Sequence, residues 1–381
     1  MTPKQRITAA MNLKKPDQVP VMCQPSWGFV LSQIPGLDPI DFWHNHDGAM
    51  ARGFCEISTR FGFDGVMIPA VGSAPLAMDQ VKKIDKNNEE GPAVYFENGD
   101  FCVYCKNDLP RYTYARAPET PFEDFDESKI GGKLMYHPPS NHLCMRLCGD
   151  IPGRTAELTK SRQIMGPDFS LHGSMYSPDD YLIDALGVEG AMIALLTEPE
   201  RCRAILIRYA EMIAGHGQEQ INAGVDAMNL SAPWCGQGFI SVDIYRNVIA
   251  PSQKVLVDMC LKNNVPVYCH TCGAIGDRLE EIINIGFTGI ECLDPPPLGN
   301  VELEDAVKRI GSRAFIKGNI DPVHMLLEET PENIITDIRA RLETGMKAPG
   351  FILSTACAIA AHTPAKHVAL LRETVDKYGK Y

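Results

Sequence analysis

Short apolar runs alternate with amphipathic segments along the second half of the chain. The apolar runs have the length and composition of buried strands, and they occupy residues 224–231, 265–270, 289–294, 314–320 and 351–356. The segments between and after them show helical spacing and helix-end signals, and they occupy residues 243–264, 275–286, 302–311, 330–345 and 363–378. The pattern therefore predicts five consecutive strand–helix units with parallel strands.

The same alternation extends upstream and predicts the fold class, which is α/β. Two further apolar runs, at residues 61–70 and 167–173, supply additional strands. A closed (β/α)8 TIM barrel accounts for the whole series with one architecture. A doubly wound open sheet is the alternative, but no glycine-rich phosphate loop follows a strand, which disfavours its nucleotide-binding form. We predict a single TIM-barrel domain over residues 1–381.

The alternation is lost between residues 72 and 165. Residues 93–106 predict a β-hairpin that turns at Asn98-Gly99-Asp100, and the segment after it is rich in Pro, Asp, Glu and Tyr. This region has too few apolar runs for a core of its own. We interpret residues 72–165 as an irregular insertion near the barrel mouth rather than an independent domain.

The net charge and the N-terminal segment indicate which partners and which cellular compartment to expect. The formal net charge is −12, which disfavours nucleic acid and anionic membranes as partners. The N-terminal residues lack the apolar core of a secretory signal, and no run is long and apolar enough for a membrane span. We expect a cytoplasmic protein in which most of the 13 cysteines are reduced, buried side chains.

Candidate chemistry lies where the stretch "VYCHTCG" ends a predicted strand. Side chains at positions i and i+2 of an extended segment face the same way, so His270 and Cys272 can reach one point while Cys269 faces elsewhere. Cys357 lies just past the last predicted strand, and all strand carboxyl ends of a barrel meet at one mouth. One histidine and two cysteines suit zinc in a catalytic site with an open fourth position.

The neighbouring strand end supplies two carboxylates, Glu291 and Asp294. We expect Glu291 to join the metal ligands and Asp294 to act as a catalytic group, although either could be the fourth ligand that gives way to substrate. Cys292 is interpreted as a packing residue. A Cys-His hydrolase is the alternative use of these residue types, but two cysteines converging with one histidine fit metal ligation better.

Three stretches resemble the uroporphyrinogen decarboxylase superfamily. They are "TPKQRITAAMNLKKPDQVPV", "GIECLDPPPLGNVELEDAVKRIGSRAFIKGNIDP" and "FILSTACAIAAHTP". The resemblance covers most of the chain outside residues 72–165 and implies a (β/α)8 barrel. The decarboxylase branch has an N-terminal arginine-rich signature for porphyrinogen carboxylates, but the matching "VPVMCQPSWGFVLSQIPG" has no arginine. Asp64 lies near the position of that branch's pyrrole-binding aspartate, so the resemblance implies a catalytic role for it.

The cobalamin-dependent methyltransferase branch of the superfamily is the better match. Its members carry zinc on a His-x-Cys pair and a distant cysteine, which correspond here to His270, Cys272 and Cys357. The segment "AIAAHTP" after Cys357 departs from the branch, where many relatives carry prolines, so the shape of this loop stays open. The resemblance implies two cofactors, Zn2+ and a corrinoid (cobalamin).

The function that the resemblance implies is methyl transfer between a corrinoid and a small-molecule methyl donor or acceptor. The chain has no Asp-x-His-x-x-Gly stretch for holding a corrinoid itself, so we expect a separate corrinoid protein as partner; a homodimer is also considered. A decarboxylase of a tetrapyrrole-like acid and a non-catalytic corrinoid or tetrapyrrole binder with structural zinc are the alternatives. An aromatic methyl ether is favoured over a small thiol, because the tyrosines of the insertion and four N-terminal aromatic residues could line an aromatic pocket. The four are Trp27, Phe29, Phe42 and Trp43. The alternative is that they are core or loop packing.

Overall fold

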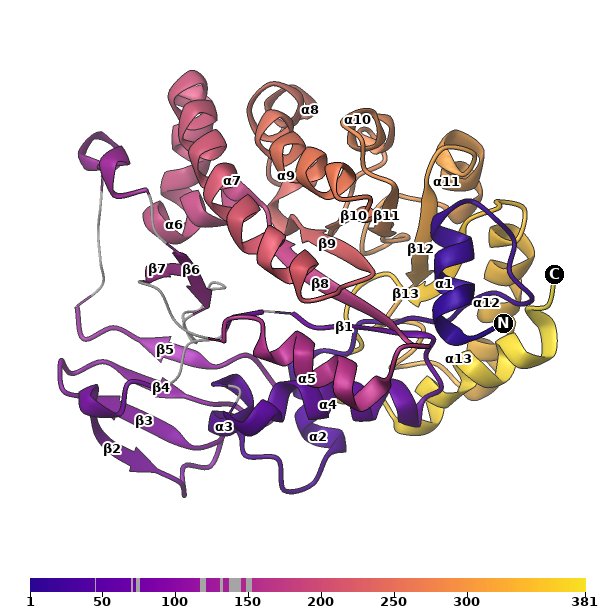
Figure 1. Cartoon of the computed structure of the whole chain (residues 1–381), viewed down its shortest axis with the longest axis horizontal. Helices are drawn as coiled ribbons and strands as arrows, with labels where there is room; N and C mark the ends of the chain where they lie inside the picture. Colours follow the sequence, from indigo (N-terminus) through magenta and orange to yellow (C-terminus); the bar gives the residue numbers. More distant parts are fainter. Residues whose placement is uncertain are drawn as a thin grey trace.

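The structure is a computed structural model that describes residues 1–44, 46–69, 71–72, 76–116, 121–130, 133–136, 145–148 and 153–381. Its centre is a seven-stranded sheet in which the strands follow one another in chain order (Figure 1). All neighbouring strands are parallel. The strands are β1 (Gly65–Met67), β8 (Ser170–Tyr176), β9 (Ala227–Ser231), β10 (Val267–Thr271), β11 (Gly289–Cys292), β12 (Phe315–Ile320) and β13 (Phe351–Thr355).

Residues 18–25 close this sheet into a barrel. Val21 forms a parallel bridge with Leu353 of β13. On the other side, the backbone N–H of Asp64, immediately before β1, donates to the Val21 carbonyl at 2.7 Å. The segment thus lies between the first and last strands and takes the place of an eighth strand. The predicted TIM-barrel fold is confirmed, although the sequence pattern does not reveal the eighth position, because only isolated residues there pair with their neighbours.

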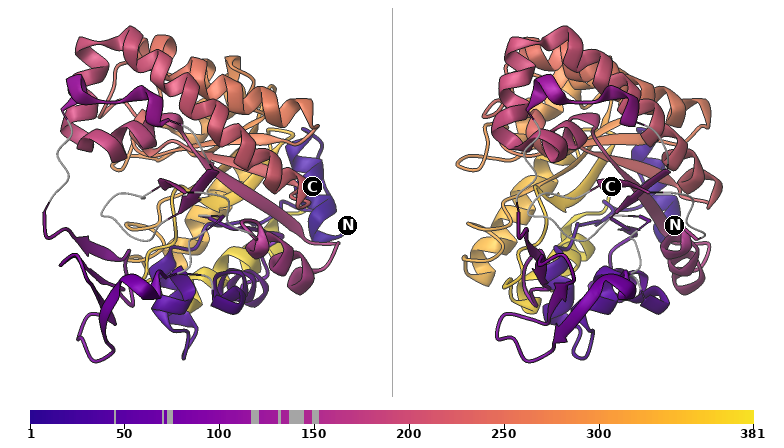
Figure 2. Two further views of the ribbon diagram at one scale, coloured as in Figure 1. Left: turned by 60° about the vertical axis from the view of Figure 1, so that its left-hand side comes forward. Right: turned by 90° about the vertical axis from the view of Figure 1, so that its left-hand side faces the viewer.

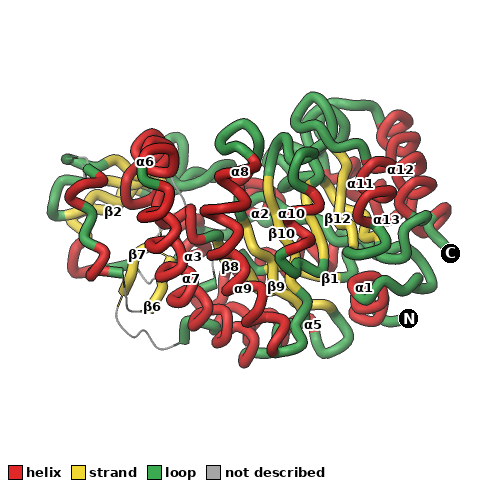
Figure 3. The backbone as a smooth tube through the Cα atoms, turned by 90° about the horizontal axis from the view of Figure 1, so that it is seen from above, coloured by secondary structure: helices red, strands yellow, loops and turns green. Residues whose placement is uncertain are grey.

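Helices surround the strands, as Figure 2 and Figure 3 show from two sides. They are α2 (Trp27–Gln33), α3 (Pro39–Trp43), α4 (Ala49–Arg60), α5 (Ala156–Met165), α6 (Pro178–Thr197), α7 (Pro199–Asn222), α8 (Val242–Ile244), α9 (Ala250–Lys262), α10 (Leu279–Asn284), α11 (Leu303–Ile310), α12 (Pro331–Gly345) and α13 (Ala365–Tyr378). α12 begins as predicted, since Thr330 accepts a hydrogen bond from the N–H of Asn333. Pro251 is the second residue of α9 and follows directly on a π-helical turn, Tyr245–Ile249, that joins α8 to α9.

The barrel interior is apolar at one end and polar at the other. Helix α1 (Pro3–Met11) covers the amino ends of the strands, and its apolar residues pack against inward-facing side chains that include Met67, Tyr268 and Phe315. Near the carboxyl ends, the strand register aligns a polar row across β8 to β12, made of Tyr176, Ser231, His270, Glu291 and Lys317. The longest row of polar side chains thus lies at the carboxyl end, where this fold places its active sites. At the apolar end, the buried His172 is in register with Met67 and contacts the Tyr268 hydroxyl at 3.0 Å.

The region between β1 and α5 departs from the barrel pattern. It contains a four-stranded antiparallel sheet, seen at the lower left of Figure 1, and a two-stranded ribbon near α6. The strands are β2 (Val81–Asp85), β3 (Ala93–Phe96), β4 (Phe101–Val103) and β5 (Arg111–Thr113), then β6 (Lys133–Tyr136) and β7 (Met145–Cys148). Parts of the predicted 72–165 insertion lie outside the described residues. Its last ten residues form α5, which packs on α4 and β8 as a barrel helix.

No helix among the described residues has the length and apolar character needed to cross a membrane. The N-terminal aromatic residues expected to line a pocket lie in the core instead. Trp27 of α2 and Trp43 of α3 are buried and pack edge to face, with ring centroids 4.1 Å apart. Phe29 and Phe42 are fully buried.

Candidate metal centre

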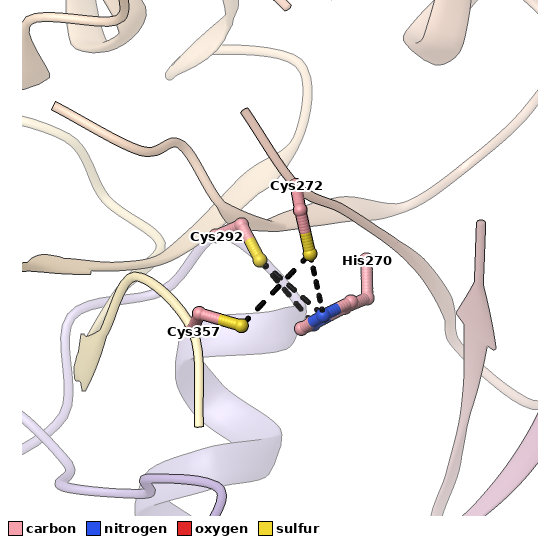
Figure 4. Close-up of side chains that lie close together, drawn as sticks. All are labelled: His270, Cys272, Cys292 and Cys357. Carbon is pink, nitrogen blue, oxygen red and sulfur yellow. Dashed lines mark hydrogen bonds between the residues drawn. The ribbon is translucent and has the colours of Figure 1, made fainter. Parts of the chain in front are cut away.

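Four side chains gather at the carboxyl ends of three strands. His270 is the penultimate residue of β10 and Cys272 follows that strand, Cys292 ends β11, and Cys357 follows β13. The ligand atoms of these four residues all lie within 4.8 Å of one another. Figure 4 shows the three sulfur atoms and the His270 ring converging on one small region. The structure therefore brings together His270, Cys272 and Cys357, as expected, and adds Cys292.

The spacing of the donor atoms fits a tetrahedral zinc ion. The Cys272 and Cys357 sulfurs are 3.9 Å apart, and the Cys272 sulfur lies 3.6 Å from Nε2 of His270. The Cys292 sulfur lies 3.4 Å from each ring nitrogen. Zinc bonds of about 2.3 Å to sulfur and about 2.0 Å to nitrogen place neighbouring tetrahedral ligands roughly 3.5 to 3.8 Å apart. Both the donor chemistry and the spacing thus suit zinc.

The electrostatics of the cluster favour a thiolate. Burial alone would lower the pKa of His270, but the sulfurs of Cys272 and Cys357 raise it to about 10. Hydrogen bonds from Cys272 and Cys292 hold the pKa of Cys357 well below its ordinary value, and His270 acts in the same direction. Burial raises the pKa of Cys292. The cluster therefore favours negative charge on the Cys357 sulfur. The thiolate is the form of cysteine that binds a metal.

Glu291, expected as a metal ligand, lies behind the histidine instead. One carboxylate oxygen is 3.2 Å from Nδ1 of His270 and accepts a hydrogen bond from the Asn229 amide at 2.9 Å. The other contacts the ammonium of Lys317. Glu291 thus occupies the position from which a carboxylate fixes the ring of a metal-binding histidine and directs the far nitrogen toward the metal.

Asp294 lies beside the cluster. Its Oδ2 accepts a hydrogen bond from the N–H of Gly273, the residue after Cys272, at 2.6 Å. Its Oδ1 is buried and has no hydrogen-bond partner among the described residues. Burial raises the pKa of Asp294 to about 6. The carboxyl group is therefore adjacent to the candidate ligands and has one oxygen free for a further contact.

Asp64 lies at the opposite end of the barrel, which argues against the catalytic role expected for it. It precedes β1, so it faces the amino ends of the strands. Its carboxylate contacts the guanidinium groups of Arg6 and Arg372 and accepts a hydrogen bond from the Val21 N–H at 2.9 Å. These contacts tie α1, α13 and the closing segment together, which is a structural role.

Cys292 is the candidate ligand that the sequence pattern misses. Regular alternation along β11 points Glu291 into the barrel and would point Cys292 outward. The backbone instead adopts left-handed conformations at Cys292, with φ +78°, and at Leu293, with φ +57°. The buried Asn319 amide donates to the Leu293 carbonyl at 2.8 Å and holds this turn. The strained step, which costs roughly 1–2 kcal/mol per residue, redirects the Cys292 sulfur to the cluster.

Comparison with known proteins defines the class to which this barrel and its cluster belong. Residues 153–378 match the sequence model of the uroporphyrinogen decarboxylase (URO-D) family. The chain belongs to this family, as the resemblance of its sequence motifs indicated.

Individual relatives fall into both branches of the family. The chain is 24% identical over 228 residues to the methylcobamide:CoM methyltransferase MtaA of Methanosarcina barkeri, a match that covers 60% of this chain and 64% of that protein. It is 30% identical over 200 residues to the uroporphyrinogen decarboxylase of a Synechococcus species, covering 50% and 52% of the two chains. The chain thus matches under two thirds of the length of each of these two relatives.

A solved methyltransferase from Methanosarcina mazei has the same fold. It superposes with a TM-score of 0.71 at 20% identity and covers 99% of both chains. At this identity the likeness establishes the architecture, so the assignment of an activity depends on the site.

Proposed function

We propose that this protein is a zinc-dependent methyltransferase that moves a methyl group between a small methylated substrate and the corrinoid of a partner protein. The observation that carries the proposal is the convergence of one imidazole and three thiols at the barrel mouth, with zinc-like spacing. The similarity to methylcobamide:CoM methyltransferases supports the corrinoid, and the missing arginine signature disfavours the decarboxylase alternative.

The roles of the residues follow from their positions. His270, Cys272 and Cys357 would hold the metal, with Cys292 as the fourth donor. Bound zinc supplies a Lewis acid that either lowers the pKa of a thiol acceptor or polarises the heteroatom that leaves a methyl donor. Glu291 orients His270, and Asp294 offers its free oxygen to a substrate group beside the cluster.

The finer choice of an aromatic methyl ether has lost part of its support. It depended on the tyrosines of the insertion and on Trp27, Phe29, Phe42 and Trp43 lining a pocket, and these four residues lie in the core. The methyl donor is therefore better sought with a panel that spans several chemical classes.

The test combines metal content with methyl transfer. The zinc-loaded protein is incubated with free cob(I)alamin and a panel of methyl ethers, methylamines and methyl thioethers, and methylcobalamin formation is followed by absorbance. We expect one zinc per chain and methylation with at least one class of donor. Cys272→Ser and Cys357→Ser should abolish both. Cys269→Ser is the matched control, since Cys269 lies on β10 three residues before Cys272, is buried and is outside the cluster.

Two outcomes would overturn the proposal. One is a wild-type chain that contains no zinc and gains no activity when zinc is added. The other is metal-independent release of carbon dioxide from uroporphyrinogen, which would identify a decarboxylase.

A further inference from the structure

A second group of buried polar side chains lies where β8 passes into α6. Asp180 and Tyr181, in the first turns of α6, have only 5% and 3% of their surface exposed. Oδ2 of Asp180 and the hydroxyl of Tyr181 are buried and have no hydrogen-bond partner among the described residues. Buried polar groups are normally paired, so two adjacent ones without a partner indicate a place where a ligand completes the contacts.

The neighbouring Asp179 shows that this is not a general property of the turn. Its carboxylate accepts hydrogen bonds from the Ser177 hydroxyl and, at 3.5 Å, from the Cys235 thiol. The Gln253 amide supports both of these groups at 3.0 and 3.5 Å. Asp179 is therefore accounted for by the packing of the helices on the sheet, whereas Asp180 keeps one oxygen without a partner among the described residues.

The position of Asp180 relates it to the metal centre. Tyr176, the last residue of β8, is in register with Ser231 of β9, which is in register with His270 of β10. Tyr176 and His270 therefore face the same side, two strand spacings or roughly 10 Å apart. Burial raises the pKa of Tyr176, and Asp180 raises it further. His270 lowers the same pKa, so both groups are close enough to act on the tyrosine. Tyr176 therefore lies close to Asp180 and also on the same face of the sheet as the candidate ligand His270.

Aromatic side chains lie close to this carboxyl group. Tyr181 stacks on Tyr209, with ring centroids 5.3 Å apart. The Trp234 side chain interacts with Asp180 and packs edge to face with Phe239 at 4.9 Å. Phe239 is 49% exposed, so this aromatic pair borders solvent at the carboxyl end of β9. Aromatic side chains together with a carboxyl group are surroundings in which proteins bind alkylammonium groups.

We propose that Asp180, together with the aromatic side chains of Tyr176, Tyr181 and Trp234, binds a positively charged group of the substrate, of the alkylammonium class, on the β8 side of the metal centre. The assignment of this group to the substrate rests on the proposed methyl transfer. It narrows the donor to a molecule that carries a cation at some distance from the methylated heteroatom. Asp180 keeps one buried oxygen without a partner among the described residues, and burial raises the pKa of this carboxyl group well above its ordinary value. The ionised form therefore needs an opposite charge beside it, which a bound cation supplies.

Binding of two matched probes tests the proposal without methyl transfer. Choline carries the cation, and 3,3-dimethyl-1-butanol is its neutral isostere. We expect choline to bind with a measurable heat in calorimetry and to change tryptophan fluorescence, because Trp234 is the partly exposed tryptophan while Trp27 and Trp43 are buried. The neutral isostere should bind at least tenfold more weakly.

Variants locate the site and separate it from the metal chemistry. Asp180→Asn should weaken choline binding at least tenfold, and Trp234→Leu should weaken it by a smaller factor. Asp243→Asn, an exposed acidic change in α8, is the control that should leave binding unaltered. Cys272→Ser should also retain binding, so a failure of the methyltransferase proposal would be visible separately.

The result that overturns the proposal is equal binding of choline and its neutral isostere, since this would make Asp180 a partner for a hydroxyl group. Full choline affinity in a folded Asp180→Asn variant, judged by its thermal unfolding, would also overturn it. Absence of choline binding to the wild-type protein would do the same.

Discussion

The two ends of the barrel both contain buried carboxylates, but their surroundings differ. At the amino end, Asp64 has two guanidinium groups and a backbone N–H around it. At the carboxyl end, Asp180 and Asp294 each keep one buried oxygen that has no partner among the described residues. Glu291 is fully engaged, but one of its partners is the candidate metal ligand His270.

We interpret this difference as a separation between groups that stabilise the fold and groups available to a ligand. Asp64 links the helices at both ends of the chain to the strand where the barrel closes. The carboxyl end instead retains strained backbone at Cys292 and unpaired oxygens near the cluster. Such features are costly to folding and persist where function requires them.

The largest effect is expected from removing the carboxylate at the amino end. Asp64→Ala leaves Arg6 and Arg372 without their shared partner and should cost about 3–5 kcal/mol of unfolding free energy. Zinc content should not change. Urea unfolding and zinc analysis measure the two quantities. Asp17→Ala is the matched control, since Asp17 also pairs with Arg6 but is 42% exposed, and it should cost under about 1 kcal/mol. Loss of zinc or of methyl transfer without loss of stability in Asp64→Ala would contradict the structural role.

The second largest effect is expected on zinc binding when one of the three thiolates at the carboxyl end is removed. Cys292→Ser should weaken zinc binding about a hundredfold, or ~2.7 kcal/mol, because one donor is replaced by a poor one. In the cobalt(II)-substituted protein, the sulfur-to-metal charge-transfer band should fall by about a third, since one of three thiolates is lost. Cys269→Ser should leave the band unaltered. An unchanged spectrum in Cys292→Ser would show that only Cys272 and Cys357 supply sulfur.

The success and failure of sequence reasoning at these two ends have a common cause. Periodicity predicts which strand ends meet, so His270, Cys272 and Cys357 could be placed at one mouth although 85 residues separate the two cysteines. It does not fix where a strand begins. The run 61–70 was predicted as one strand, but β1 starts at Gly65, and Asp64 therefore falls at the amino end.

The hydrophobic pattern of the sequence does not predict the local backbone conformation at Cys292. Glu291 and Cys292 are neighbours, and alternation allows one of them to face the barrel mouth. The left-handed turn at Cys292 brings its sulfur to the cluster while Glu291 stays inside, and no glycine marks that turn. A buried asparagine 27 positions downstream, Asn319, holds it by a side-chain hydrogen bond. Such a contact is tertiary and leaves no periodic signal in the sequence.

A smaller effect should follow from changing the carboxylate behind the histidine. Glu291→Gln keeps the size of the side chain but removes the charge that holds the His270 ring, so zinc affinity should fall about 10- to 100-fold. X-ray absorption of the zinc-loaded variant should show an unchanged set of sulfur and nitrogen ligands. Loss of an oxygen ligand from the wild-type spectrum on this substitution would instead make Glu291 a direct ligand. Competition with a chromophoric chelator gives the affinities.

The last prediction concerns how the free energy of unfolding changes with pH. It depends on Lys317, which contacts Glu291 on the side away from His270. Burial lowers the pKa of Lys317 to about 7 in the folded protein, from 10.5. Between these values the unfolded chain keeps a proton that the folded chain has lost, so this residue makes wild-type stability rise with pH, by at most ~1.4 kcal/mol per pH unit.

Lys317→Met should remove this contribution, so the difference in unfolding free energy between wild type and variant should grow in favour of the wild type from pH 7 to pH 9. Urea unfolding at pH 7, 8 and 9 measures it. Lys254→Met, on the exposed side of α9, should keep the wild-type slope. Parallel pH profiles for wild type and Lys317→Met would mean that the lysine stays charged beside Glu291. The carboxyl end would then hold a permanent ion pair like the one around Asp64, and the contrast between the two ends would be limited to Asp180, Asp294 and the metal cluster.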